Sequence, residues 1–410
     1  MTPLTRFATL AIAALLLATV PVQAQPPAPG TNPDGPMEFE TRGVSYRLVP
    51  IADGLVHPWS IGFLPGSDTL LVNEHAGRLR MIRGGELLPD PVWEAPLAPE
   101  DARGGSNNTR LHALAVHPNF AENGLVYLSH VKWGELGTTL AVSRGRLDGE
   151  TLEDVEEVFV ADAWETGGNL GGRIRFAPDG TLYITVGDRD RLCCIPEDDP
   201  SLRIKAQSLE NHVGKTLRIR DDGSVPDDNP FVGRDDALPE IYTYGHRNGY
   251  DLAFHPETGE LWQVEIGPLG GDEINILRPG RNYGWPLVST GRNYTGTQVS
   301  DEPWYRPGME MPRMHWVPAV SPSSIMFYTG ERFPEWTNSA FVGALTTRVL
   351  LRISFGNRSQ DERRDALLAP LRLRVRDVAQ GPDELIYLAT ELSFGGANPD
   401  GTIVRIEPVE

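Results

Sequence analysis

Four loop segments carry polar residues that could do chemistry, and each follows a stretch with the pattern of a β-strand. They span residues 167–191, 244–254, 264–286 and 372–384. His246, Arg247 and Asn248 offer hydrogen-bond donors, while Arg374 and Arg376 alternate and so share one face of a predicted strand. Each feature also has a plain structural explanation, because loop side chains often bond loop carbonyls and arginine pairs are often solvated or paired with acids. No single segment decides between a binding site and a scaffold.

A strand, a Pro-containing turn and a second strand recur along the chain and must position these loops. The units are WSIGFLPGSDTLLVNE, LHALAVHPNFAENGLVYLSH, GRIRFAPDGTLYITVGD, YDLAFHPETGELWQVE, SSIMFYTGERFPEWTNSAFVGAL and VRDVAQGPDELIYLATE. Most are followed by another alternating segment, such as GRLRMI or GKTLRIR. The repeat of roughly sixty residues contains no long amphipathic helix, which is typical of a repeated β architecture.

These six units predict an all-β fold, a six-bladed β-propeller with four-stranded antiparallel blades over residues 43–410. A β-sandwich array is the alternative, but a sandwich domain would be shorter and would rarely repeat the same turn six times. Propellers gather function at one end of the central channel, on loops that enter from several blades. The four polar segments can therefore share one site although they lie far apart in the sequence.

The N-terminus predicts export. Residues 1–24 contain Arg6, an apolar run over residues 7–20 and a final Val22-Gln23-Ala24, the pattern of a cleaved signal peptide. A membrane anchor is the alternative, but the apolar run is short for a membrane span. Residues 25–42 begin with QPPAPGTNPDGP and are expected to form a Pro-rich linker. We expect a periplasmic or secreted protein without membrane insertion.

The formal net charge of −19 disfavours nucleic acid and anionic membranes as partners, because both are negatively charged. Neutral sugars, alcohols and cations remain compatible. The two cysteines, Cys193 and Cys194, are adjacent and can form only a small strained ring, so a loop-locking disulfide and free thiols both stay open.

Taken together and in this order, the segments resemble the soluble glucose/sorbosone dehydrogenase family, the aldose sugar dehydrogenases that use pyrroloquinoline quinone (PQQ). The resemblance covers residues 55–406 and rests on GGR, PDGTLYITVGD, YGHRN, GPLGGDEIN, NYGWP and RDVAQGPD. It implies a site for PQQ and calcium that acts on a small-molecule sugar or alcohol and passes electrons to an unknown acceptor.

The resemblance also implies roles for individual residues. Arg374 and Arg376 would hold the PQQ carboxylates, for which bidentate arginine is well suited. Arg247 and Asn248 would stabilise negative charge on the quinone oxygens. Backbone carbonyls of a Gly-Pro pair would hold a catalytic calcium, and a second, structural calcium would lie near the DEIN and NYGWP motifs. The matching metal residues are Gly267, Pro268, Glu273 and the Tyr283 carbonyl.

Several positions depart from the family pattern at the cofactor-facing end. Asn169 stands where the family has a general-base His, and an amide cannot accept a proton at neutral pH. Asp188, which would orient that His, is retained. Thr346 replaces a Lys that pairs with a cofactor carboxylate, and Asp251 is expected to lower the positive charge of the site further. Ile266 and Cys193 stand where polar residues are usual.

The leading interpretation is a PQQ- and calcium-dependent dehydrogenase of aldose sugars or related alcohols. The second is a catalytically degenerate propeller that binds a sugar or partner without redox chemistry, because Asn169 replaces the base. Glu165 and His112 are the candidates for a substitute base. A calcium-dependent propeller lactonase is the third, although such enzymes hold calcium with side chains rather than with a backbone Gly-Pro site.

Overall fold

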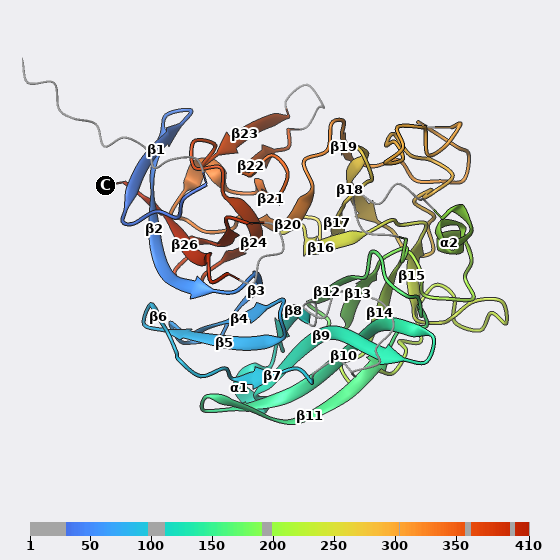
Figure 1. The fold of residues 1–410 in the computed structure, drawn as a ribbon, viewed down its shortest axis with the longest axis horizontal. Coiled ribbons are helices and arrows are strands. Elements are labelled where there is room, and N and C mark those ends of the chain that lie inside the picture. The colour runs from blue at the N-terminus through green and yellow to red at the C-terminus, as the bar shows by residue number, and fades with distance from the viewer. Residues whose placement is uncertain are drawn as a thin grey trace, which may run out of the picture.

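The computed structural model describes residues 30–96, 111–190, 199–302, 304–356, 362–393 and 398–409. In these residues the chain forms six antiparallel sheets arranged around a central axis (Figure 1). The predicted all-β, six-bladed propeller is confirmed. The expected signal peptide and the Cys193–Cys194 pair lie outside the described residues.

The first three blades follow one another along the chain, each with its first strand nearest the axis (Figure 1). Blade 1 contains β3 (Pro58–Phe63), β4 (Leu70–Glu74), β5 (Arg78–Arg83), β6 (Glu86–Leu87) and β7 (Trp93–Glu94). Blade 2 contains β8 (Leu111–Val116), β9 (Leu125–Gly134), β10 (Gly137–Asp148) and β11 (Thr151–Val160), with helix α1 (Phe120–Asn123) between β8 and β9. Blade 3 contains β12 (Gly171–Phe176), β13 (Leu182–Val186), β14 (Lys215–Ile219) and β15 (Ile241–Tyr244), and helices α2 (Pro200–Arg203) and η1 (Ile204–Gln207) precede β14.

The last three blades complete the ring and bring the ends of the described chain together. Blade 4 contains β16 (Gly249–Phe254), β17 (Leu261–Glu265), β18 (Asp272–Leu277) and β19 (Met314–Trp316). Blade 5 contains β20 (Pro322–Phe327), β21 (Ala340–Ala344), β22 (Val349–Ser354) and β23 (Arg363–Leu367), with helix η2 (Pro334–Trp336) before β21. Blade 6 contains β24 (Arg374–Gln380), β25 (Ile386–Glu391) and β26 (Gly401–Pro408) and is completed by β2 (Val44–Leu55) and β1 (Met37–Thr41).

Blade 6 closes the propeller, because the N-terminal strand β2 pairs with the C-terminal strand β26. Strand β1 extends this sheet at its edge, so Met37–Thr41, which belongs to the range expected as linker, is a paired strand. The inner strands β3, β8, β12, β16, β20 and β24 each contact the next and form a closed ring around the channel. A closed ring fixes the loops of all six blades relative to one another.

Each predicted strand–turn–strand unit is the inner hairpin of one blade, and the β12–β13 hairpin shows how the turn works. Gly180 has φ 83°, a conformation that favours glycine. Its N–H donates to Ala177 O, and Ala177 N donates to Thr181 O at 2.8 Å. The Asp179 carboxylate accepts a hydrogen bond from Thr181 N. The Pro-Asp-Gly sequence therefore encodes the turn by local hydrogen bonds and backbone conformation.

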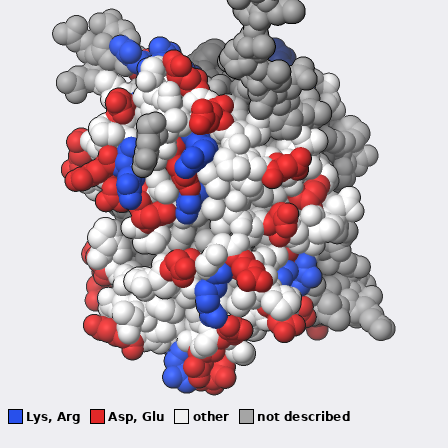
Figure 2. Space-filling model, turned by 90° about the vertical axis from the view of Figure 1, so that its left-hand side faces the viewer, with Lys and Arg blue, Asp and Glu red and all other residues white. Residues whose placement is uncertain are grey.

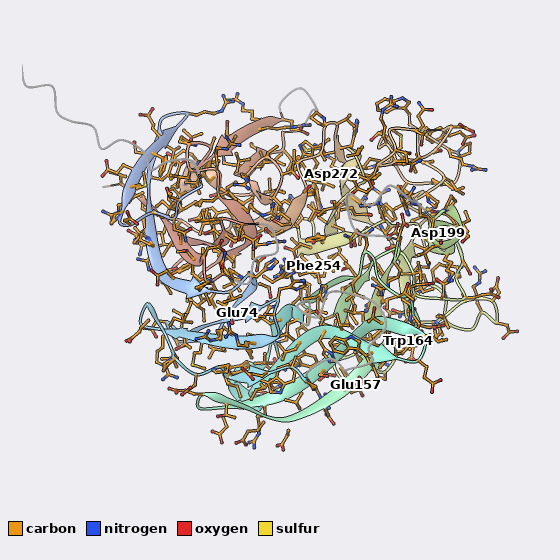
Figure 3. All side chains as sticks on the ribbon, viewed as in Figure 1. Glu74, Glu157, Trp164, Asp199, Phe254 and Asp272 are labelled. Atoms are coloured by element: carbon orange, nitrogen blue, oxygen red, sulfur yellow. The ribbon has the colours of Figure 1, made fainter. Side chains whose placement is uncertain are left out.

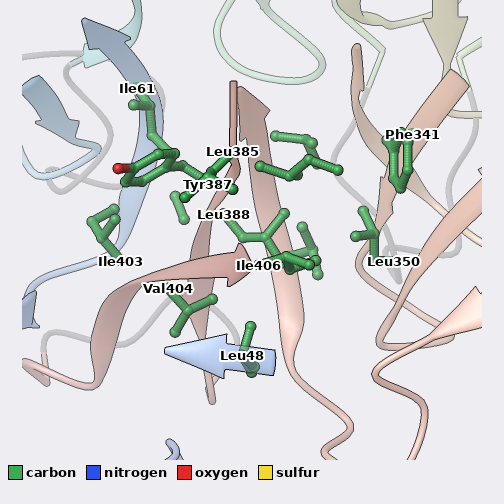
Figure 4. Packing of buried hydrophobic residues seen from close by; sticks show 14 of the residues in the cluster. Leu48, Ile61, Phe341, Leu350, Leu385, Tyr387, Leu388, Ile403, Val404 and Ile406 are labelled. Atoms are coloured by element: carbon green, nitrogen blue, oxygen red, sulfur yellow. The ribbon is translucent and has the colours of Figure 1, made fainter. Parts of the chain in front are cut away.

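The hydrophobic core lies between adjacent blades rather than at one centre. The largest cluster joins blades 5, 6 and 1 and contains Leu48, Phe341, Tyr387 and Ile406 (Figure 4). Burial of such side chains stabilises the fold by about 1.5–3 kcal/mol each. In the described part of the chain no helix is long and apolar enough to cross a membrane. The face in Figure 2 carries intermixed acidic and basic side chains.

Candidate functional site

The six inner strands begin at the same end of the channel, and contacts between neighbouring blades run round that end. We call it the site end. These contacts join Asp188 N to Arg247 O, Asp272 to Val320 N, Arg374 to Leu345 O, Glu391 to His57, His75 to Leu111 O, and Gly172 to His112. Figure 3 marks Glu74 and Asp272, which belong to blades 1 and 4 on opposite sides of the ring. The expected site residues therefore come from different blades but reach one region.

Arg374 and Arg376, both on β24, are buried at the site end and share one carboxylate. Arg374 Nε lies 2.9 Å and Arg376 Nη2 lies 2.6 Å from Glu391 Oε1. Glu391 reaches both because it lies opposite Arg374 in the β24–β25 register. The Arg376 guanidinium lies 4.3 Å from the centroid of the Trp59 ring, which stacks on His75. Carboxylate and indole thus hold the arginine pair in place.

The arginine pair creates a positive potential at the site end. Its effect is visible at His57, whose imidazole Nε2 lies 3.3 Å from Glu391 Oε2. Burial, followed by the charges of Arg376 and Arg374, lowers the pKa of His57 to about 3. His57 is therefore neutral at physiological pH, mainly because it is buried, and the two arginine charges act in the same direction. Such a potential suits an anionic ligand.

Arg247 and Asn248 lie in the loop between β15 and β16, also buried at the site end. Arg247 Nη1 donates to Ile266 O at 2.8 Å and to Gly267 O at 2.9 Å. Its Nε is buried and has no hydrogen-bond partner among the described residues. Asn248 Oδ1 accepts a hydrogen bond from Gly171 N. An unpartnered buried guanidinium nitrogen is a donor that a polar ligand can satisfy.

Asn169 contacts Asp188, the residue expected to orient a histidine at position 169. Asn169 Nδ2 donates to Asp188 Oδ1 at 2.9 Å, while Trp285 Nε1 donates to Asp188 Oδ2 at 2.8 Å. Burial raises the pKa of Asp188, although the Arg247 charge and the bond from Asn169 act against the rise. Asn169 Oδ1 lies 3.4 Å from Asn248 Nδ2. The carboxylate therefore orients an amide that cannot act as a base.

Two acidic residues, Glu265 and Glu273, lie beside Arg247. Glu265 Oε1 and Glu273 Oε2 both accept hydrogen bonds from Asn275 Nδ2, at 2.9 and 3.0 Å. Burial, followed by the Glu265 charge, raises the pKa of Glu273 to about 8. Asn275 Oδ1 is buried without a partner among the described residues. Glu265, Glu273, Tyr283 and Arg247 line a cavity of about 10 Å³, room for one water-sized occupant.

The Gly267–Pro268 turn lies beside this cavity, and Asp272 holds it. Asp272 Oδ1 accepts from Gly267 N, and Oδ2 accepts from Val320 N and Ser321 N. The Gly267 carbonyl already accepts from Arg247. Among the described residues, no group of three His, Cys, Asp or Glu side chains could by itself hold a metal.

Thr346 and Asp251 are the two residues expected to lower the positive charge of the site, and they lie in different places. Thr346 is exposed in the β21–β22 turn, and its hydroxyl lies 2.6 Å from Ser321 Oγ. The expectation that Asp251 lowers the charge of the site is wrong. Asp251 lies in the channel wall, 3.1 Å from Arg173 Nε and 3.2 Å from Arg175 Nη2, which neutralise it. The residue therefore belongs to the scaffold.

The two candidates for a substitute base have different surroundings. The Glu165 carboxylate pairs with Lys205, which commits it to another partner. His112 lies against Gly172, and both of its ring nitrogens are buried without a hydrogen-bond partner among the described residues. Burial lowers the pKa of His112 well below its ordinary value, so the ring is a neutral, weak base in this structure.

Four residues of the site end were not predicted from the sequence: Glu391, Trp285, Asp272 and Glu265. Asp272 and Trp285 stood inside quoted motifs, and their hydrogen-bonding capacity was the available signal. Glu265 directly precedes Ile-Gly-Pro, where an acid at a strand end was visible. Glu391 lies 15 residues beyond Arg376 and is brought to it only by strand pairing. Nothing local in the sequence marks that contact.

Known proteins with a similar sequence and fold extend this picture. The model of a family described as glucose/sorbosone dehydrogenase matches residues 55–405. Aldose sugar dehydrogenase YliI of Escherichia coli is 34% identical over 351 residues, which cover 84% of this chain and 90% of that protein. The match extends over almost all of the propeller.

Two solved structures share the fold over nearly their whole length. The soluble aldose sugar dehydrogenase of Escherichia coli in its apo-form has a TM-score of 0.78 and 32% identity, covering 89% of this chain and 100% of that one. The PQQ-bound form of an aldose sugar dehydrogenase from Streptomyces coelicolor has a TM-score of 0.68 and 26% identity, covering 92% of this chain and 99% of that one.

Proposed function

Because this chain belongs to the glucose/sorbosone dehydrogenase family, we propose that it is a PQQ-dependent oxidoreductase that oxidises aldose sugars or related alcohols outside the cytoplasm. The observation that carries the proposal is the buried Arg374–Arg376 pair at the site end, with Arg247 from another blade. Three guanidinium groups in one channel mouth of a protein with net charge −19 call for an anionic ligand. The sequence of residues 1–24 supports export.

The residues at the site end fit PQQ, which carries carboxylates and an ortho-quinone. Arg374 and Arg376 would hold carboxylates, and the unpartnered Arg247 Nε is a free donor for a quinone oxygen. When bound, PQQ supplies a two-electron acceptor for the substrate. Glu391 and Trp59 would hold the arginines in position before the cofactor arrives, which reduces the entropic cost of binding.

Calcium fits the acidic cavity better than the Gly267–Pro268 turn. The Gly267 carbonyl already accepts a hydrogen bond from Arg247, which takes up one of its acceptor positions. Glu273 instead presents a carboxyl group that accepts a hydrogen bond from Asn275, and Asn275 Oδ1 is an unpartnered acceptor. Glu265 lies beside them, although His246 and the backbone N–H of Arg247 already donate to it. Oxygen ligands of this kind suit Ca²⁺. We therefore assign calcium to this cavity, with the Tyr283 carbonyl as a further ligand.

Asn169 limits the rate that this site can reach. Its amide oxygen can accept a hydrogen bond from a substrate hydroxyl and orient it, but it cannot take the proton. Loss of a general base costs on the order of 10²–10⁴-fold in rate. The second candidate is a propeller that binds a sugar or partner without redox chemistry. It rests on the same residue, because Asn169 supplies no base and its amide is already hydrogen-bonded to Asp188.

Reconstitution of the exported protein tests both candidates. PQQ is titrated with and without Ca²⁺ and followed by absorbance and calorimetry, and dye reduction is then measured with a panel of aldoses. The proposal expects saturable PQQ binding and slow, sugar-dependent dye reduction. Binding without turnover would favour the second candidate. No PQQ binding under any condition would overturn the dehydrogenase proposal.

Two variants give this experiment its controls. R376Q removes one of the cations expected at the carboxylates and should weaken PQQ binding. R332Q changes an exposed arginine in the β20–β21 loop, at the far end of the channel, and should leave binding unchanged. Equal affinity of R376Q and the unmodified protein would show that PQQ binds elsewhere.

A further inference from the structure

The turn between β21 and β22 lies directly against the arginine pair. The carbonyl of Leu345, the first residue after β21, accepts a hydrogen bond of 3.1 Å from Arg374 Nη1. Thr346 N donates to Val320 O, and the Thr346 hydroxyl contacts Ser321, so the turn is fixed to the start of blade 5. Thr346 carries no charge. The cation that this turn offers is Arg348.

Arg348 lies close to the arginine pair, at the segment that leads into β24. A Cβ atom added to Gly30 would lie 3.8 Å from Arg348 Nη1, and Gly30 N donates to Leu371 O, three residues before Arg374. Arg348 also has φ 56°, an unfavourable conformation for a residue with a side chain. The turn therefore sets the direction of this side chain at some cost in backbone energy.

Electrostatics gives independent support for this placement. Burial lowers the pKa of Arg374, and the charges of Arg376 and, more weakly, Arg348 lower it further. Like charges affect each other in this way only when they are near. Arg348 and Arg374 are thus neighbours that repel one another in the absence of an anion.

Arg348 differs from the other cations at the site end in lacking a partner. Arg376 pairs with Glu391, Arg189 donates to three backbone carbonyls, and Arg247 donates to two. For Arg348 the described residues provide neither an ion pair nor a hydrogen bond, and its side chain is only partly buried. Because it can reach solvent, it is available to a ligand that enters the channel mouth.

We propose that Arg348 is a cofactor-binding residue and completes, with Arg374 and Arg376, a three-arginine site for carboxylates. The proposal rests on the proposed function, because the carboxylates are those of PQQ. Its physical basis is that an anion with several carboxylates would relieve the repulsion between Arg348 and Arg374 and would give Arg348 its missing partner.

The test compares PQQ affinities of R348Q, R348K and the unmodified protein by calorimetric titration at low and moderate salt. One charge-assisted hydrogen bond corresponds to about a tenfold change in Kd, so R348Q should bind PQQ about tenfold more weakly. R348K keeps the charge and should lose about threefold or less. R348Q should also show a weaker dependence of Kd on salt, because one ionic contact is gone. R332Q serves as the matched control with unchanged affinity.

The possible failures are distinguishable. If the unmodified protein binds PQQ and R348Q binds it equally well at both salt concentrations, the role of Arg348 is wrong and the proposed function stands. If the unmodified protein does not bind PQQ, the proposed cofactor and the role of Arg348 fall together. Thermal melts of both variants verify folding, which the partly exposed position in a turn should preserve.

Discussion

Asn169 is the residue at which activity should respond most to one substitution. Its Nδ2 donates to Asp188, and a histidine in its place can keep such a bond while its second ring nitrogen accepts a proton. We expect N169H to raise the rate of PQQ-dependent dye reduction by on the order of 10²–10⁴-fold. N169Q keeps an amide and should show no gain. PQQ binding by N169H without faster turnover would contradict a role for this position in proton transfer.

Glu273 is the residue at which calcium should act. Glu273 is mostly protonated at neutral pH because its pKa is raised to about 8, so Ca²⁺ must displace that proton to bind. Because the ion would bind the folded chain, we expect it to raise the melting temperature and EDTA to lower it. E273Q should lose most of this response. D227N, which changes an exposed acid on a surface loop, should keep it. If neither Ca²⁺ nor EDTA changes the melting temperature of the unmodified protein, the proposed calcium site is excluded.

At the residue scale the sequence is informative where a contact is local. The alternation of Arg374 and Arg376 predicts a shared face, and both reach the same oxygen of Glu391. The prediction that Asp251 adds negative charge to the site is wrong, because Arg173 pairs with it. Arg173 lies 78 residues earlier, and only the ring of blades brings the two side chains together. Ion pairs between residues so far apart in the sequence cannot be predicted from the spacing of residues along the chain.

At the scale of elements, a buried ion network joins the inner strands. Arg173 on β12 contacts Asp251 on β16 and Asp377 on β24, and the two acids accept bonds from Ile325 N and Ile61 N. Strands of blades 3, 4, 6, 5 and 1 are thereby connected across the channel. Both acids are buried, so each depends on its partners to remain ionised.

Burial should decide what these ion pairs contribute. Arg173 and Arg175 both contact Asp251 Oδ1, but their side chains are 4% and 41% exposed. R173Q leaves a buried acid without its main cation and should reduce the free energy of unfolding by about 3–5 kcal/mol. R175Q should reduce it by about 1 kcal/mol or less. Urea unfolding measures both, and equal losses would show that burial is not the deciding factor.

Elements were predictable where their signal is repeated and local. All six Pro-turn hairpins lie where the sequence indicates, because turn chemistry and strand alternation act within about twenty residues. Strand β1 was not predictable, since Met37–Thr41 follows a Pro-rich stretch and its sheet is completed by a strand from the other end of the chain. Pairing of such distant segments depends on ring closure.

At the scale of the whole molecule, closure of the ring buries histidines from adjacent blades at the site end. His57 and His75 come from blade 1 and its entrance, and His112 comes from blade 2; the His57–His75 and His75–His112 ring centroids lie 5.2 and 4.8 Å apart. Burial is the main cause that lowers the pKa of all three. Each ring is therefore neutral when folded and protonates more readily when the chain unfolds.

This arrangement predicts a pH-dependent contribution to stability with a definite sign. A lowered folded-state pKa means that the contribution is fully present above the unfolded value of 6.5 and is lost as pH falls below it, down to about 3 for His57. Each histidine can cost up to about 1.4 kcal/mol per pH unit in that range. Buried acids such as Asp188 and Asp377, with raised pKa values, act in the opposite sense. The test must therefore compare variants rather than follow one protein.

We expect H112Q to unfold more easily than the unmodified protein at pH 7.5, because the change disturbs a packed position against Gly172. Its disadvantage should shrink as the pH falls from 6.5 to 5, by about 1–2 kcal/mol, since the glutamine cannot be protonated. Urea midpoints at four pH values measure this difference. H315Q, which changes a histidine on β19 outside the cluster, is the matched control and should run parallel to the unmodified protein. If the difference in urea midpoint between H112Q and the unmodified protein stays constant with pH, His112 has the same pKa in the folded and the unfolded chain. Closure of the ring would then not lower the pKa of His112.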